Sequence, residues 1–324
     1  MTSYKPTGID FKAITDKCVE LMEEDNTSFM GALWNDKSGR FSPFNLATQA
    51  EYKGCNIINL WIEGHVNGFS SMGWMTLLQA KQIGAKLLTL PNDHPGRGDS
   101  KTGQKGTPVY NAGKFVPKDR YSRQGSHYLD LKEGVLVGLE KAQRQYLRVA
   151  GHVFNLEQFD PETIPEEYRP KPFVPASKTE IEKVFEQFEC KEEVSVDNRC
   201  FYKPSTHTVH MVAKDCFTSE DDWIHVRSHE YVHATGHPTY LNRFKVGETR
   251  DQAQYAYEEL IAEMGSAFMC ASFGIAVTWR HAEYLKHYLA VLKADEKALF
   301  HAAADAQKAV ELLLNKQTQQ EIAA

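Results

Sequence analysis

The sequence HEYVH at 229–233 constrains this 324-residue chain most, because it places two imidazoles one helical turn apart. Residues i and i+4 of a helix lie on the same face, so His229 and His233 can bind one divalent ion. A catalytic zinc ion takes three protein ligands and keeps a fourth position open. The fold must therefore bring a third ligand from another part of the chain against this face.

Capping signals place the motif inside a helix. Ser219, with Asp222 three residues later, is typical of a capping box at a helix start, and Gly236 and Pro238 end the helix. A bound ion lowers the pKa of a coordinated water towards about 7 and polarises a substrate carbonyl. Glu230 projects beside the ion, so we expect it to remove the water's proton as the catalytic base.

The third ligand is predicted to be a glutamate. A further histidine ligand in the metzincin pattern would stand at position 239, where the chain has Thr239, and His237 comes two residues too early. The next predicted helix, residues 251–273, carries several acids. In glutamate-type zincins the third ligand is followed one turn later by an acid that hydrogen-bonds a ligand histidine from behind. Glu259 with Glu263 has that spacing.

Glu258 precedes the expected ligand on the same helix. It points about 100° away from Glu259, which favours a surface or capping charge. For a set of two histidines and one glutamate we expect zinc, and manganese or another divalent ion stays open.

A proline-rich segment divides the chain. Five prolines lie between Asp160 and Ser177 among many charges, which is typical of a linker. The length suits two domains of roughly 150 residues. We predict an α+β protein with an N-terminal α+β domain at 1–158, a linker at 159–178, and a mostly helical domain with a small β-sheet at 179–324.

The segment that precedes the motif helix predicts a β-hairpin. Residues 199–212 read RCFYKPSTHTVHMV, two alternating stretches joined at 204–206. Zincins commonly align an extended peptide along an edge strand, so we expect the hairpin from Phe201 to Met211 to lie beside the metal.

Charge separates the two halves. Residues 1–150 hold 19 Lys and Arg against 15 Asp and Glu, and the remaining residues hold 18 against 28. The segment Arg97–Arg123 alone has a net charge of +5. A basic segment on an acidic protein fits an anionic polymer, and a solvated loop without a particular role is the alternative.

Cysteines and apolar runs exclude other classes. The six cysteines form no C-x-x-C pair, which favours reduced, mostly buried thiols. No apolar run reaches the length of a signal peptide or of a membrane span. We therefore expect a cytoplasmic protein without a membrane partner.

Binding of single-stranded DNA needs aromatic faces for the bases and cations for the phosphates. The aromatic residues of the first half include Trp34, Phe41, Phe44, Tyr52, Trp61 and Trp74. Trp61 and Trp74 lie inside apolar segments, which favours the core. The predicted DNA-binding residues are Arg40, Tyr52, Lys53, Lys101 and Lys105.

Longer segments carry a family resemblance. SHEYVHATGHPTYLNR and YAYEELIAEMGSAFMCASFGI resemble the ArdC antirestriction family of conjugative plasmids. LWNDKSGRFSPFNLATQAEYKGCNIINLW, WMTLLQAKQIGAKL, KTGQKGTPVY and HVFNLEQFD are similar to its N-terminal domain, which binds single-stranded DNA and is shared with TraC-type primases. The resemblance implies that His229, Glu230 and His233 are the metallopeptidase motif and that Glu259 belongs to the downstream acidic segment.

From these features we expect an antirestriction protein of a mobile element that binds single-stranded DNA, carries the metal site and protects incoming DNA from host restriction. Two alternatives stay open. The chain is an active metal-dependent peptidase localised to DNA, with a protein substrate such as the host restriction machinery. Or it is a non-enzymatic single-stranded-DNA-binding protein in which the metal is structural.

Overall fold

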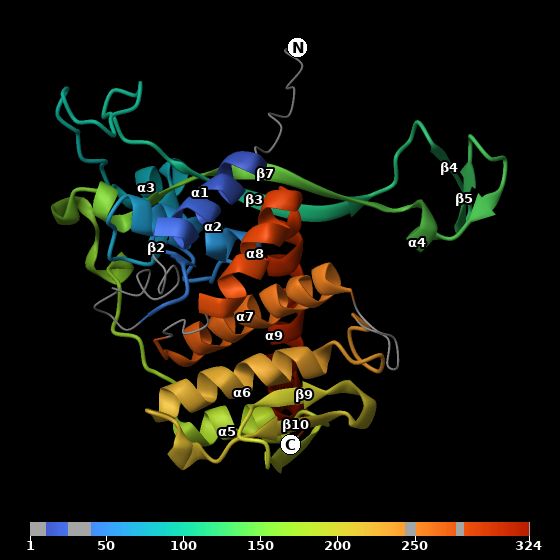
Figure 1. The fold of residues 1–324 in the computed structure, drawn as a ribbon. Helices are drawn as coiled ribbons and strands as arrows, with labels where there is room; N and C mark the ends of the chain where they lie inside the picture. Colours follow the sequence, from blue (N-terminus) through green and yellow to red (C-terminus); the bar gives the residue numbers. More distant parts are fainter. Residues whose placement is uncertain (1–10, 25–39, 244–250, 277–281, 324) are drawn as a thin grey trace. The chain divides into compact units, whose positions relative to one another are not determined.

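The computed structural model describes residues 11–24, 40–243, 251–276 and 282–323 (Figure 1). The fold is α+β, as predicted, and the chain divides into two compact units. Gly106–Val153 forms the smaller unit, and Phe11–Lys105 joins the residues from Phe154 onwards in the larger one. The larger unit therefore combines residues from both sides of the proline-rich segment, and the predicted domain boundaries stay a prediction.

The larger unit begins with short elements. In chain order they are α1 (Phe11–Glu24), β1 (Phe44–Asn45), α2 (Cys55–Val66), β2 (Gly73–Thr76) and α3 (Leu77–Ile83), with β1 and β2 parallel. Thr76 caps α3, since its hydroxyl accepts from the backbone N–H of Gln79 at 3.2 Å, and Gly84 ends α3 in the left-handed conformation. Both residue types are typical of the helix ends that they form.

Most of the aromatic candidates form core. Trp61 and Trp74 are each 1% exposed, as predicted, and Phe41 and Phe44 are buried with them. The indole N–H of Trp61 donates to the carbonyl of Phe41 at 2.9 Å. Trp34 lies outside the described residues.

The rest of the larger unit is mainly helical and lies around α7. After turns at η2 (Leu156–Gln158), η3 (Pro161–Thr163) and η4 (Glu166–Tyr168) come α5 (Lys178–Glu186), β8 (Lys191–Val194), β9 (Phe201–Lys203), η5 (Pro204–Thr206), β10 (Thr208–Met211), η6 (Lys214–Cys216), α6 (Glu220–Thr235), α7 (Gln252–Phe273), α8 (Ala282–Ala294) and α9 (Ala298–Ala323). Helix α7 is buried along most of its length and contacts α6, α8 and α9. Across the described residues, no helix combines the length and the apolar character that a bilayer span needs.

The predicted hairpin is confirmed as β9 and β10, which pair antiparallel. Strand β10 lies at the centre of a three-stranded sheet, with β8 parallel on its other side. This order leaves β9 at an edge. Strand β8 was not predicted, because its residues KEEV lack the apolar alternation that marks a half-buried strand.

Helices α6 and α7 approach closely at one glycine. A Cβ atom on Gly265 of α7 would lie 2.8 Å from Cγ2 and 2.9 Å from Cγ1 of Val232, a fully buried residue of α6. Such contacts are shorter than atoms tolerate in a packed interior. Gly265 therefore permits the short distance between the two helices that carry the predicted ligands.

The smaller unit is a long two-stranded ribbon with a small sheet. Strand β3 (Thr107–Phe115) pairs antiparallel with β7 (Arg144–Asn155), with a register shift at Val109/Tyr110. Figure 1 shows this ribbon leading to the small sheet and to a short helix. The elements there are β4 (Tyr121–Gln124), β5 (His127–Asp130), β6 (Leu136–Val137) and α4 (Leu139–Ala142), around a core of Tyr121, Val137 and Ala142.

Candidate metal centre

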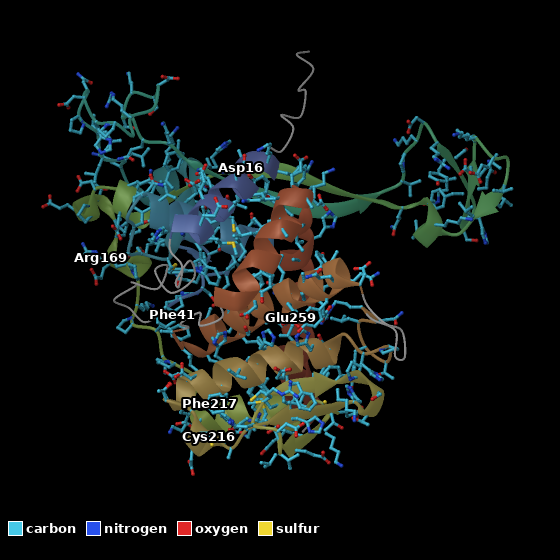
Figure 2. The ribbon with its side chains drawn as sticks, in the orientation of Figure 1. Asp16, Phe41, Arg169, Cys216, Phe217 and Glu259 are labelled. Carbon is cyan, nitrogen blue, oxygen red and sulfur yellow. The ribbon has the colours of Figure 1, made fainter. Side chains whose placement is uncertain are left out.

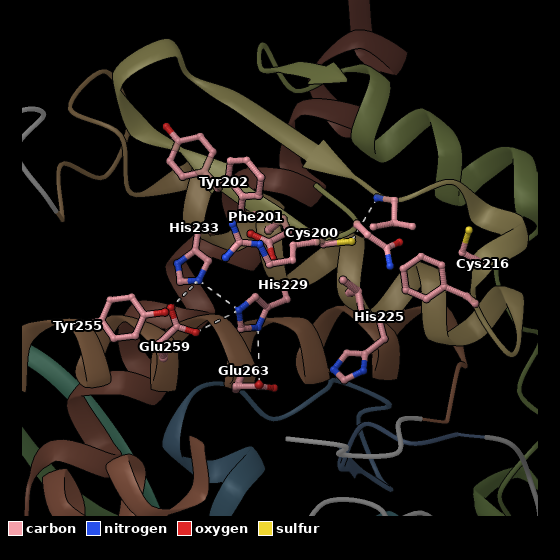
Figure 3. Close-up of a pocket in the computed structure, with 16 residues that line it drawn as sticks. Cys200, Phe201, Tyr202, Cys216, His225, His229, His233, Tyr255, Glu259 and Glu263 are labelled. Atoms are coloured by element: carbon pink, nitrogen blue, oxygen red, sulfur yellow. Dashed lines mark hydrogen bonds and ion pairs between the residues drawn. The ribbon is translucent and has the colours of Figure 1, made fainter. Parts of the chain in front are cut away.

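Two helices bring the predicted ligands together. The Nε2 atoms of His229 and His233, both on α6, are 3.2 Å apart. Glu259 reaches them from α7 (Figures 2 and 3), with Oε2 3.5 Å from Nε2 of His229 and Oε1 3.4 Å from Nε2 of His233. These side chains form a cluster able to hold a metal ion.

The cluster has the size that a tetrahedral ion requires. Ligand bonds of about 2.0–2.2 Å at tetrahedral angles separate neighbouring ligand atoms by about 3.3–3.6 Å. The two Nε2 atoms are 3.2 Å apart, and each lies 3.4–3.5 Å from a different oxygen of Glu259, which is close to this range. One ligand atom from each residue lies within 4.8 Å of the other two. Two imidazoles and one carboxylate also match the donor set of catalytic zinc sites. The residues present therefore fit a divalent ion.

Charge inside the cluster is balanced by protons. Burial disfavours charge on both imidazoles, yet the adjacent carboxylates outweigh it, raising the pKa of His229 and raising that of His233 to about 10. Burial likewise disfavours the Glu259 carboxylate, but hydrogen bonds from the histidines hold its pKa well below its usual range. Since an ion binds the deprotonated imidazole, an ion at this cluster would displace the proton that His233 holds.

The expectation that Glu258 is a surface or capping charge is wrong. It is 4% exposed, and its Oε1 accepts from Nδ1 of His233 at 3.2 Å. The two neighbouring acids do point in different directions, but the His233 ring lies between them. Its Nε2 faces Glu259 and its Nδ1 faces Glu258. A carboxylate on Nδ1 fixes the tautomer whose Nε2 can bind a metal.

Arg243, which no sequence pattern marks, completes this arrangement. Its guanidinium donates from Nε to Oε2 of Glu258 at 3.0 Å and from Nη2 to Oε1 at 2.8 Å. It also donates to the hydroxyl of Thr235 at 2.9 Å and to the carbonyl of Val232 at 2.7 Å, near the end of α6. A buried carboxylate needs such a cation, but only the folded chain shows which arginine supplies it.

Glu263 lies behind the other histidine. It is 3% exposed, and its Oε1 is 3.8 Å from Nδ1 of His229, beyond hydrogen-bond distance. The same oxygen accepts from the hydroxyl of Tyr288 at 3.4 Å. Glu263 therefore lies on the Nδ1 side of His229, where its spacing from Glu259 placed it, but the predicted hydrogen bond is not formed.

A cavity of about 710 Å³ opens over the cluster and contains Glu230. Phe201 and Tyr202 of β9 line it from one side and Tyr255 of α7 from another (Figure 3). The predicted position of the hairpin beside the centre is therefore confirmed for its edge strand. Burial raises the pKa of the Glu230 carboxyl, which suits a group that accepts a proton and returns it.

Three of the predicted DNA-binding residues are engaged within the larger unit. The Arg40 guanidinium lies 3.6 Å above the Phe44 ring, and Nζ of Lys53 is 2.6 Å from a carboxylate oxygen of Glu311 on α9. The half-buried Tyr52 accepts a hydrogen bond from Asn45 at 3.3 Å.

The remaining two, Lys101 and Lys105, are exposed on a loop. Arg97, which lies in the same loop, holds its backbone by donating a hydrogen bond from Nη2 to the carbonyl of Lys101 at 3.1 Å. A second link joins the loop to the 3-10 turn η2, where the Gln158 amide donates to the carbonyl of Lys105 at 3.0 Å. The loop therefore presents both ammonium groups from an ordered backbone.

Comparisons with known proteins match both parts of the chain. Residues 179–305 match the family of zincin-like metallopeptidases, and residues 11–148 match the N-terminal domain of the anti-restriction factor ArdC. An uncharacterized protein of Sinorhizobium fredii, y4eC, is 28% identical over 313 residues, which are 95% of this chain and 92% of that protein. A DNA primase TraC of Escherichia coli is 31% identical over 282 residues, 85% of this chain but 24% of the primase.

Two solved structures of an ArdC protein are similar to this chain over almost its whole length. The metal-free crystal structure of the antirestriction ArdC protein from the R388 plasmid has a TM-score of 0.70 and 26% identity, covering 96% of this chain and 99% of that one. The Mn(II)-bound structure of the same protein has a TM-score of 0.66 and 26% identity, covering 95% and 98%.

The site and the fold around it thus define a zincin-like metallopeptidase domain, which follows an ArdC N-terminal domain in the same chain. With this two-domain architecture over almost its whole length, the chain belongs to the ArdC family of antirestriction proteins, as the sequence resemblance implied.

Proposed function

We propose that the chain protects the incoming DNA of a mobile element from restriction, by binding single-stranded DNA and by means of a divalent ion at His229, His233 and Glu259. The observation that supports this most directly is the grouping of two imidazole nitrogens and a carboxylate oxygen within 4.8 Å of one another, in a chain that aligns with ArdC over 96% of its length. Zinc is the preferred ion for this donor set, with manganese as the alternative, because the R388 ArdC structure contains Mn(II).

A second candidate function, cleavage of a protein substrate, is favoured by Glu230. This acid lies in the cavity outside the ligand set, beside the edge strand β9. An extended peptide can add to such an edge through backbone hydrogen bonds. When bound, the ion supplies a Lewis acid and lowers the pKa of water. Glu230 then accepts the proton of the attacking water and delivers it to the leaving amine.

A plasmid-transfer assay into a restricting host separates these functions. We would compare wild type with Glu230→Gln, which keeps the ligands and the side-chain volume, and with His233→Ala, which removes a ligand. If peptide cleavage is required, both variants lose protection. If the metal is structural, Glu230→Gln retains protection and His233→Ala loses it. Retention of protection by both variants would contradict any role for the metal centre.

A further inference from the structure

The smaller unit carries a net positive charge, whereas the rest of the chain has a net negative one. Residues 106–153 contain eight Lys and Arg against four Asp and Glu, whereas the rest of the chain contains 29 against 39. Residues 1–105, which include all five predicted DNA-binding residues, contain 11 of each and are neutral. The surplus of four cationic charges in residues 1–150 therefore lies entirely on the β3–β7 ribbon and its small sheet.

Two of the four acids of this unit, Asp130 and Glu133, contact the same cation, Arg120, whose Nη2 lies 3.1 Å from the first and 3.5 Å from the second. Exposed cations lie next to these residues along the chain, namely Lys118, Arg123 and Lys132. Clustered cations of this kind attract a phosphate backbone and lower the free energy of the complex by releasing counterions.

The same unit exposes apolar side chains. The segment 131–139 contains Leu131 (53% exposed), Val135 (46%), Leu136 (62%) and Leu139 (45%). A soluble monomer rarely gathers exposed apolar surface without a binding role. Apolar groups among cations suit a ligand that alternates phosphates with planar bases. In a duplex the base faces are stacked on each other, whereas in a single strand they are accessible.

We propose that the smaller unit, Gly106–Val153, is the surface that contacts single-stranded DNA. Lys118, Arg123 and Lys132 contact phosphates, and the exposed leucines contact bases. This inference rests on the proposed function, and it relocates the contact from the residues that the sequence suggested. Arg40 and Lys53 already have partners within the larger unit, over Phe44 and beside Glu311.

Anisotropy titrations of a labelled oligodeoxythymidine with the full-length protein test the proposal at several salt concentrations. Each phosphate contact on a single strand contributes about −0.7 to the slope of log affinity against log salt. Combined Lys118→Gln, Arg123→Gln and Lys132→Gln substitutions should therefore make the slope shallower by about 2. Combined Leu131→Ser and Leu136→Ser substitutions should weaken binding at every salt concentration and leave the slope unchanged.

A matched control is the pair Lys81→Gln and Lys86→Gln, which neutralises two exposed lysines of the larger unit and should change neither quantity. This inference is wrong, and the proposed function stands, if wild type binds the oligonucleotide and the triple variant has the same affinity and salt slope as wild type. In that case combined Lys101→Gln and Lys105→Gln substitutions should remove the salt dependence. If wild type does not bind the oligonucleotide, both fail. Tighter binding to a duplex than to the single strand would overturn the choice of ligand.

Discussion

The metal centre and the smaller unit differ in how firmly the fold holds their functional side chains. At the centre, His233 meets a carboxylate at each ring nitrogen, and both carboxylates come from one buried helix. In the smaller unit, the proposed phosphate contacts are exposed in a strand of the small sheet and in the turns beside it. A preorganised site depends on each of its members, whereas an electrostatic surface adds up many weak contacts. Single substitutions should therefore have large effects at the centre and small ones in the smaller unit.

Removal of the metal should give the largest effect. An ion that binds only the folded state stabilises it by about 4 kcal/mol when its free concentration is a thousand times its Kd. Wild type should therefore melt several degrees lower after treatment with a chelator, and metal analysis should find one ion per chain before treatment. His233→Ala should contain no ion and should melt equally with and without the chelator. If wild type contains no ion and has the same melting temperature with and without the chelator, the cluster is not a metal site.

Glu258→Gln tests how the ligand is held. The amide keeps the volume of the side chain but loses the charge that contacts His233 Nδ1 and Arg243. Loss of such a supporting partner costs about 10–100-fold in metal affinity, and we expect a reduction of this size in competition titrations with a fluorescent chelator. The control is Glu296→Gln, which makes the same change at an exposed acid between α8 and α9 and should leave the affinity as in wild type. An unchanged affinity in Glu258→Gln would mean that His233 is oriented without this carboxylate.

Gly265→Ala tests the distance between α6 and α7. The added Cβ would lie 2.8 Å from Val232, whose branched side chain is fully buried. Overpacking of this kind costs about 1–3 kcal/mol and should separate the ligands of the two helices. We expect a lower midpoint in urea unfolding and weaker metal binding. Adding Val232→Ala should restore part of the urea midpoint and part of the metal affinity. If the double variant is no more stable and binds metal no more tightly than Gly265→Ala, the strain does not arise at Val232.

The sequence predicted those parts of the centre that depend on spacing within one helix. HEYVH fixes the two histidines on a common face of α6, and the separation of Glu259 and Glu263 fixes two acids on one face of α7. The contacts of Glu258 and Arg243 could not be predicted in the same way. They depend on how α6 lies against α7 and on where the chain turns after α6, neither of which a local pattern contains.

The arrangement of the larger unit was also beyond local patterns. Trp61 of α2 packs against Phe268 of α7 with ring centroids 5.8 Å apart, although 207 positions separate them in the numbering. Periodicity indicates that such residues are buried and does not name their partner. The small sheet of the smaller unit was missed for another reason. Strands β4 and β5 are four residues each and largely polar, so they lack a strand signature.

The smallest expected effect belongs to Lys53, a predicted DNA contact whose ammonium group is 2.6 Å from Glu311. The side chains are 67% and 38% exposed, and an ion pair as accessible as this contributes about 0–1 kcal/mol to stability. If the smaller unit carries the phosphate contacts, Lys53→Gln should leave the salt slope of DNA binding unchanged and should shift the thermal midpoint by no more than Glu311→Gln does. If Lys53 contacts DNA instead, Lys53→Gln should make the slope shallower by about 0.7. Glu311→Gln should then tighten binding, because it releases the lysine from its partner. Measuring both variants beside wild type decides whether the larger unit shares the DNA surface.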